Sequence, residues 1–225
     1  MEQHHPKVIS FDCYGTLIDW KQGVIQSLHP LLAEYHLNIP EEDLFTLFAE
    51  ADRYFTSGKY ITYREILIRT MKWIADRLGI NLHGNDEKAL TGSFPNWKPF
   101  PDVQEALGQL KRKYPLVILS NVDDDLFSFT RKLLGVTFDE VITAYQVRSY
   151  KPSPVHFREA TDRLGIEKEE MLHVAQSIYH DIEPCLELGI PCVWINRYGE
   201  AVPKVIKDNK LPFFHALDDL VEVLM

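Results

Sequence analysis

Asp12 is the first residue of the chain whose type and position could do chemistry. It directly follows the short apolar run of residues 7–11 (KVISF), and residues 13–16 (Cys-Tyr-Gly-Thr) come after it. The apolar run is typical of a strand, and the glycine is typical of a tight turn. A carboxylate at a strand end can act as a nucleophile, and the backbone N–H groups of a turn can converge on an anion. Taken alone, Asp12 could equally cap the turn, so its role depends on the residues at other strand ends.

Polar residues also stand beside later apolar runs. Ser120 directly follows residues 116–119 (LVIL), and the apolar run at residues 171–175 leads into a segment that ends at Asp181. Lys151 lies between these two segments and could neutralise negative charge. Each residue has an ordinary explanation, since Ser120 could cap a helix and Lys151 could be a surface lysine. Their coincidence at successive strand ends favours one shared site.

The elements that must position these residues alternate between strand and helix after the proline-rich stretch at residues 95–101. Strand-like runs are expected at residues 116–119, 141–142, 171–175 and 191–195, and helices at residues 102–113, 125–134, 153–165 and 181–188. This alternation predicts an α/β fold, a doubly wound parallel sheet with helices on both faces, which the strand at residues 7–11 joins. Ligands of such sheets bind beyond the carboxyl ends of the strands, where the polar residues are expected to meet.

Residues 20–95 follow a different pattern. Apolar positions recur at three and four residues from about Val24 to Phe55 and again from Tyr63 to Leu78, before Gly79. This spacing predicts helices, and a glycine is a common residue just past a helix end. The sequence therefore predicts a core made of residues 1–19 and 96–225, interrupted by an all-helical cap at residues 20–95. A cap that leaves directly after the first strand would cover the site as a lid.

The composition limits the class of protein. The chain has 225 residues, of which 45% are hydrophobic and 25% charged, enough for a core domain with a smaller insertion and too apolar for a disordered or fibrous protein. A net charge of −9 disfavours nucleic acid and anionic lipid as partners. The first residues do not read as a signal peptide, and no run of apolar residues is long enough for a membrane span. A cytoplasmic protein without membrane or nucleic-acid partners is expected, and a homodimer is compatible with the sequence.

The three cysteines, Cys13, Cys185 and Cys192, are expected to be free thiols. His180 could act directly in the site because it neighbours Asp181, or it could pack at a helix start. The acidic run at residues 123–125 is interpreted as a solvated loop that enters a helix.

Together these motifs resemble the haloacid dehalogenase-like hydrolase superfamily, and the resemblance covers essentially the whole chain. Its first motif, Asp-x-x-Gly-Thr, is matched by residues 12–16, its second by Ser120, and its third by Lys151 before Pro152. The fourth, acidic motif is matched in part by residues 175–181. The resemblance implies a Rossmann-like core, and the helical insertion resembles the cap of the first subclass of this family.

Within that family, the first motif of the 2-haloacid dehalogenases reads Asp-x-Tyr-Gly-Thr, which residues 12–16 match. The resemblance implies that Asp12 displaces halide from carbon and forms an aspartyl ester, which water then hydrolyses. Lys151 and Asp181 would hold one another and orient or activate that water. Thr16 and Ser120 complete the catalytic residues that the resemblance implies.

The resemblance also implies a substrate-binding set, in which Asn121 helps to cradle the leaving halide. Dehalogenases carry an arginine early in the cap, but no Lys or Arg lies between Lys21 and Arg53, so Arg64 or Arg53 is expected to take its place. The substrate-binding residues predicted on this basis are Tyr14, Gly15, Asn121, Gln176, Ser177 and Arg64.

Phosphatases of the same family hold Mg²⁺ with the first Asp and with a carboxylate of the fourth motif, and they usually carry a second Asp two positions after the first. Here those last two positions are Gln176 and Tyr14. The leading hypothesis is therefore a hydrolase that uses no cofactor or metal and acts on a small anionic organic acid with a leaving group at C2. The alternatives are a Mg²⁺-dependent phosphatase of small phosphorylated metabolites and a catalytically silent family member that binds a partner.

Overall fold

The computed structural model describes residues 6–225 and contains one six-stranded sheet in which every neighbouring pair of strands is parallel. The strands lie in the order β3-β2-β1-β4-β5-β6. They are β1 (Val8–Phe11), β2 (Leu116–Ser120), β3 (Glu140–Thr143), β4 (Met171–Ala175), β5 (Cys192–Ile195) and β6 (Phe213–Phe214). Because the chain builds outwards in both directions from β1, the predicted doubly wound α/β fold is confirmed.

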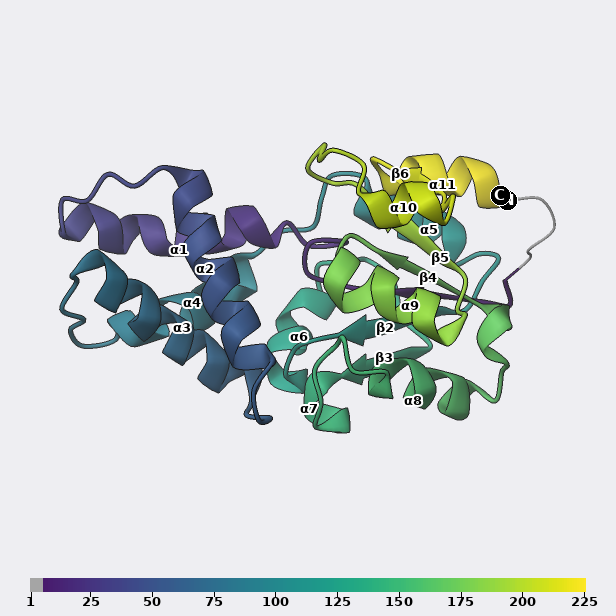
Figure 1. Ribbon diagram of the computed structural model, residues 1–225, viewed down its shortest axis with the longest axis horizontal. Coiled ribbons are helices and arrows are strands. Elements are labelled where there is room, and N and C mark those ends of the chain that lie inside the picture. The colour runs from purple at the N-terminus through teal and green to yellow at the C-terminus, as the bar shows by residue number, and fades with distance from the viewer. Residues whose placement is uncertain (1–5) are drawn as a thin grey trace.

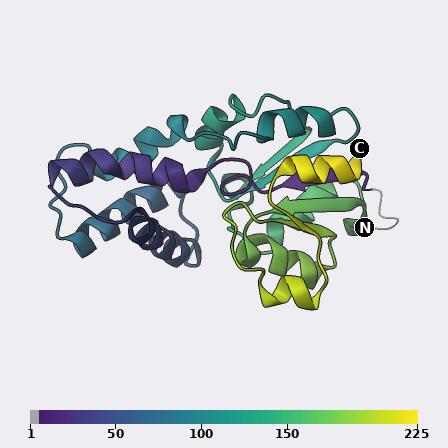
Figure 2. The same ribbon diagram turned by 90° about the horizontal axis from the view of Figure 1, so that it is seen from above.

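Helices cover both faces of the sheet (Figures 1 and 2). They are α5 (Val103–Leu110), α6 (Asp124–Arg131), α7 (Ala144–Val147), α8 (Val155–Leu164), α9 (Glu183–Leu188), α10 (Lys204–Asp208) and α11 (Leu217–Leu224). Successive strand residues point to opposite faces, so Ile9 packs in one buried cluster with residues of α5 and α11, while Val8 packs in a second cluster with residues of α8 and α9. Burial on both faces explains why the central strands read as continuous apolar runs.

Four further helices form a lobe beside the sheet (Figure 1), which we call the cap lobe. They are α1 (Trp20–Glu34), α2 (Glu41–Thr56), α3 (Tyr63–Leu78) and α4 (Ala89–Ser93). The chain leaves β1 at Phe11 and enters α1 at Trp20, so the cap lobe lies beyond the carboxyl ends of the strands. The helical pattern between residues 24 and 55 is divided between α1 and α2, whereas α3 has the bounds that its spacing predicts and ends at Gly79, whose φ is 68°. The division into core and cap domains at residues 19/20 and 95/96 stays a prediction.

Some local features differ from the sequence-based expectations. The helix α8 begins at Val155 with Pro154 at its cap position, two residues later than the start expected at residue 153. Asp102, where the helix at residues 102–113 was expected to begin, occupies the cap position of α5 and makes no side-chain cap bond; its carboxylate instead accepts two hydrogen bonds from Arg197 at 2.8 and 2.9 Å. The three cysteines are free and buried, as predicted. Within residues 6–225, no helix combines the length and the apolar character needed to cross a membrane.

Candidate active site

A pocket of about 220 Å³ lies where the carboxyl ends of the strands meet the cap lobe. Its core side is built by residues that follow β1, β2 and β4, and its other side by residues of α1, α2 and α3. The lining residues are Asp12, Tyr14, Trp20, Ala49, Asp52, Arg53, Tyr63, Ser120, Asn121, Lys151, Gln176, Ser177, Tyr179, His180 and Asp181. Eight of the eleven residues of the predicted site line this pocket, and a ninth, Thr16, donates a hydrogen bond to Asp12. The two predicted residues that the structure places elsewhere are Gly15 and Arg64.

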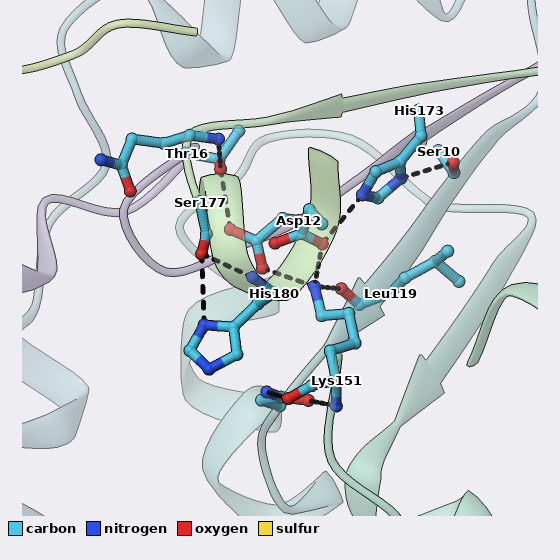
Figure 3. Close-up of polar contacts among 11 residues, drawn as sticks. Ser10, Asp12, Thr16, Leu119, Lys151, His173, Ser177 and His180 are labelled. Carbon is cyan, nitrogen blue, oxygen red and sulfur yellow. Dashed lines mark hydrogen bonds and ion pairs between the residues drawn. The ribbon is translucent and has the colours of Figure 1, made fainter. Parts of the chain in front are cut away.

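Asp12 lies at the centre of this arrangement (Figure 3) and is buried. Its Oδ2 atom accepts a hydrogen bond of 2.7 Å from the Thr16 hydroxyl, and its Oδ1 atom accepts one of 2.9 Å from the Lys151 ammonium. Burial raises the pKa of Asp12 above its ordinary value, while the positive charge of Lys151 opposes that rise. Both carboxylate oxygens are therefore oriented by fixed donors, as a nucleophile that must attack from one direction requires.

Lys151 connects Asp12 to the second carboxylate of the site. Its ammonium donates hydrogen bonds to Asp12 Oδ1, to Asp181 Oδ1 at 2.6 Å and to the Leu119 carbonyl at 2.8 Å, and the side chain is only 1% exposed. Burial alone would lower the pKa of Lys151, but the charges of Asp12 and Asp181 outweigh burial and raise it. Lys151 is thus a buried, permanently charged group and not a surface lysine.

Asn121 holds the backbone of Lys151. Its Oδ1 atom accepts a hydrogen bond of 2.7 Å from the Lys151 N–H, and its Nδ2 atom donates one of 3.1 Å to the Lys151 carbonyl. Asn121 also lines the pocket. The sequence did not predict that its side-chain amide holds the backbone of Lys151 in place. The halide contact expected of Asn121 stays a prediction.

Asp181 is completely buried and has a second partner that the sequence analysis missed. Its Oδ1 atom contacts His173 Nε2 at 2.9 Å, and His173 Nδ1 contacts the Ser10 hydroxyl at 2.8 Å. Burial alone would raise the pKa of Asp181, but the charge of Lys151 and the hydrogen bond from His173 hold that pKa well below its usual range. Within the described residues, Asp181 Oδ2 has no hydrogen-bond partner and is shielded from solvent, which leaves an unsatisfied acceptor in the wall of the pocket.

The register of the sheet creates the contact between Ser10 and His173, because these two residues are direct partners on the paired strands β1 and β4. Each is a single polar residue inside an otherwise apolar run, and both are completely buried. A lone polar residue in a strand buried on both faces needs a hydrogen-bond partner. That pattern is the sequence signal that could have identified this pair.

The hydroxyl groups of Ser120 and Ser177 have different surroundings. Ser120 Oγ is buried in the pocket wall with no partner among the described residues, so it can donate to a bound molecule. Ser177 Oγ accepts the His180 N–H at 3.1 Å and thereby caps the π-helical turn at Ile178–Ile182. Burial lowers the pKa of His180 to about 4, which leaves its ring neutral near pH 7.

Gln176 supports Thr16 from the backbone. Its N–H donates a hydrogen bond of 2.9 Å to the Thr16 hydroxyl and so fixes the hydroxyl that donates to Asp12.

Arg64 lies outside the pocket, contrary to the expectation that it lines the site. Its guanidinium donates to Asp125 at 2.5 Å, and it borders a separate depression. Arg53 lines the pocket instead, with its guanidinium carbon 4.1 Å from the centre of the Tyr179 ring. The helical spacing could not separate the two arginines, because which one reaches the site depends on how the cap lobe is seated on the core.

Gly15 is also a correction, since it does not line the pocket. Its N–H donates to the Ile18 carbonyl at 2.8 Å, and its φ is 96°. A side chain at this position would bring a Cβ atom to 3.1 Å from Trp20 Nε1 and 3.3 Å from Gln176 Oε1. Gly15 is therefore required for the turn and for close packing, rather than being placed to bind an anion with its N–H.

Tyr14 lines the pocket, and its hydroxyl is 2.8 Å from the Thr130 hydroxyl of α6. The acidic run at residues 123–125 is not simply solvated, because Asp123 is buried and accepts hydrogen bonds from the N–H groups of Tyr63 at 2.9 Å and Arg64 at 2.8 Å. Asp123 belongs to the core sequence and the two donors begin α3. This carboxylate therefore joins the sheet side of the molecule to the cap lobe and stabilises the start of a helix.

The donor set does not fit a Mg²⁺ ion of the phosphatase kind. Asp12 and Asp181 both direct their Oδ1 atoms at Lys151, which already places a positive charge between them. Gln176 offers a neutral amide where a carboxylate ligand would be needed. Across residues 6–225, no group of three or more His, Cys, Asp and Glu side chains is arranged to hold a metal ion.

The parallel sheet, the buried and lysine-paired aspartate at the end of its first strand and the helical cap lobe agree with the arrangement expected from the motifs. Residues 6–189 match the family described as haloacid dehalogenase-like hydrolase, and the chain belongs to that family. The resemblance drawn from the motifs is confirmed by this match.

The chain is similar to several proteins that are named as dehalogenases. The chain is 26% identical to haloacetate dehalogenase H-2 of Moraxella sp. (strain B), over 96% of this chain and 98% of that protein. It is 25% identical to (S)-2-haloacid dehalogenase of Pseudomonas sp. (strain YL), over 86% of this chain and 84% of that protein. A crystal structure of a dehalogenase with an intermediate complex has the same fold, with a TM-score of 0.86 at 22% identity over 99% of this chain and 98% of that one.

Proposed function

We propose that this protein hydrolyses a carbon–halogen bond at C2 of a small organic acid through a covalent ester on Asp12. The observation that carries the proposal is the position of Lys151, which pairs with Asp12 and Asp181 at 2.9 and 2.6 Å in a site that has Tyr14 and Gln176 where a phosphatase needs acidic groups. The names of the curated relatives, a haloacetate dehalogenase and a 2-haloacid dehalogenase, support the same chemistry.

In the first half-reaction, a carboxylate oxygen of Asp12 attacks C2 of the substrate. The new carbon–oxygen bond forms as the carbon–halogen bond breaks, and the halide leaves with the bonding electrons. Thr16 and Lys151 hold the attacking carboxylate, and the unpartnered Ser120 hydroxyl is available to donate to the substrate carboxylate. Orienting the two reactants in this way lowers the entropic part of the barrier.

In the second half-reaction, water attacks the carbonyl carbon of the Asp12 ester. Lys151 stabilises the oxyanion that develops on the ester, and the free Oδ2 atom of Asp181 orients the water. One proton of the water goes to the departing alkoxide, which becomes the product hydroxyl, and the other is released to solvent, while Asp181 stays ionised. The carboxylate of Asp12 is thereby regenerated.

The experiment that tests this function measures halide and phosphate release side by side. We expect the protein to release chloride from 2-chloropropanoate, with the same rate after exhaustive chelation, because Lys151 supplies the positive charge that a metal would otherwise provide. We expect negligible phosphate release from p-nitrophenyl phosphate even with excess Mg²⁺. Chelator-sensitive phosphate release without halide release would replace the proposal with the phosphatase alternative, and no turnover of either class would favour a binding role.

Arg53 is the cap residue that we expect to attract the substrate carboxylate. Its guanidinium lies over Tyr179 at the edge of the pocket, where solvent screens its charge, so Arg53→Gln should raise KM by about three- to tenfold with a smaller effect on kcat. Arg64→Gln is the matched control, because it removes the same charge from the same lobe outside the pocket. Steady-state kinetics of both variants check the assignment, and equal effects at the two positions would contradict it.

A further inference from the structure

Asp52 is a buried carboxylate in the wall of the pocket that the proposed reaction does not use. It lies on α2 in the cap lobe, is 6% exposed and lines the same pocket as Asp12. Its Oδ1 atom accepts a hydrogen bond of 2.9 Å from the Tyr63 hydroxyl. Within residues 6–225, no charged side chain pairs with Asp52, and the neighbouring Arg53 directs its guanidinium to the Tyr179 ring.

A carboxylate in such surroundings is unfavourable unless something compensates its charge, because a single neutral hydroxyl replaces only part of its hydration. Burial raises the pKa of Asp52 to about 6, although the hydrogen bond from Tyr63 acts in the opposite direction and lowers this pKa. Asp52 is therefore mostly ionised near pH 7.5. The same pocket contains two cationic side chains, Lys151 and Arg53, of which Lys151 is already shared by two other carboxylates.

An ionised Asp52 is poorly suited to a substrate in which every group other than the carboxylate and the halogen is apolar. The Asp52 carboxylate would repel the carboxylate of a 2-halogenated acid placed beside it. An alkyl group packed against Asp52 would displace water from its free oxygen and would not replace the lost hydrogen bonds. A substrate that carries a hydrogen-bond donor would satisfy that oxygen. A purely structural link between α2 and α3 through Tyr63 would need an acceptor, but it would need neither a negative charge nor a place in the pocket wall.

We propose that Asp52 forms a specificity subsite that binds an ammonium or hydroxyl group of the substrate, on the side of the pocket formed by the cap lobe. The substrate class is then a small 2-halogenated acid that also carries an amino or hydroxyl group. This inference rests on the proposed function, because Asp12 attacks C2 of that substrate while Asp52 binds its donor group. Tyr63 is a positioning residue, which holds the Asp52 carboxylate in place.

The test compares three substrates that differ only at C3, namely 2-chloropropanoate, 2-chloro-3-hydroxypropanoate and 3-amino-2-chloropropanoate. We expect wild-type kcat/KM for the amino compound to exceed that for 2-chloropropanoate by roughly 10- to 100-fold at pH 7.5, as a charge-assisted hydrogen bond provides. Asp52→Leu should abolish or reverse this preference. Asp52→Asn should lose the preference for the amino compound while keeping part of the preference for the hydroxy compound, because an amide oxygen still accepts a hydrogen bond.

Two control variants separate specificity from folding and from net charge. Asp43→Asn removes the same charge from an exposed position in the first turn of α2, and it should leave the preference unchanged. Tyr63→Phe should lower Tm and retain most of the preference, since the Asp52 charge remains. If Asp52→Leu and Asp52→Asn lower Tm but leave the ratio of kcat/KM values as in the wild type, Asp52 is only a structural link and the proposal is wrong.

A binding experiment separates this inference from the proposed function. Calorimetric titration with propanoate, 3-hydroxypropanoate and 3-aminopropanoate requires no turnover, and wild type should bind 3-aminopropanoate tighter than propanoate by a factor that Asp52→Leu removes. If this difference is found but no chlorinated acid is turned over, the subsite stands and the proposed reaction fails. If halide is released from all three substrates without any preference that depends on Asp52, the reaction stands and the subsite fails.

Discussion

Asp12→Asn is expected to remove turnover, with a loss of about 10⁴-fold or more in kcat, because the amide has no carboxylate oxygen to form the ester. The fold should remain intact, since asparagine has almost the shape of aspartate and Lys151 keeps its ion pair with Asp181. Halide release and thermal unfolding measure the two effects. Mass spectrometry must show that the variant is not deamidated, and an undeamidated variant with a rate within about tenfold of wild type would exclude Asp12 as the nucleophile.

The same role makes an isotopic prediction for the wild-type protein. In a single turnover in ¹⁸O-labelled water, one labelled oxygen should appear in the Asp12 carboxylate, because water attacks the ester carbonyl and the product keeps the oxygen that Asp12 supplied. Mass spectrometry of the peptide that contains Asp12 locates the label. Label found at once in the product, with none in the protein, would show that water attacks the substrate directly.

Lys151→Met is expected to have the second largest effect, a loss of about 10²- to 10³-fold in kcat. The substitution removes the donor at 2.9 Å from Asp12 and leaves Asp12 and Asp181 as buried carboxylates without their shared cation. Breaking such a buried group should also lower the free energy of unfolding by about 3–5 kcal/mol. Lys204→Met provides the matched control, because that side chain is 90% exposed.

The pH profile distinguishes a catalytic Lys151 from one that only supports the fold. The charge of Lys151 lowers the pKa of Asp12, so its loss should raise that pKa further. Asp12 must be ionised to attack, and the activity that remains in Lys151→Met should therefore fall off at a higher pH on acidification than in the wild type. Lys151→Arg should restore part of the stability and move the acidic limb back. A near wild-type rate in Lys151→Met would show that the ion pair has no part in catalysis.

The sequence determined those parts of the fold that depend on local periodicity and on turn chemistry. The bounds of α3 and β4 follow from the spacing of apolar residues and from the residues that end each element. The alternation of strands and helices was sufficient to predict a parallel sheet. Because the carboxyl ends of parallel strands share one edge, it also predicted that Asp12, Ser120, Lys151 and Asp181 would meet in space.

The tertiary structure alone decided which groups reach that edge from elsewhere. The register of β1 against β4 places Ser10 opposite His173, and the seating of the cap lobe selects Arg53 over Arg64 and turns Asp52 into the pocket. Asp123 stabilises a helix that begins some 60 residues earlier in the chain. Contacts between distant segments leave little trace in local spacing, since their partners are set by how whole elements pack and not by the residues immediately beside them. A single sequence therefore predicted that Asp12, Thr16, Ser120, Lys151 and Asp181 belong to one site, whereas the contact of His173 with Asp181 and the cap-lobe residues of the pocket became visible only in the folded chain.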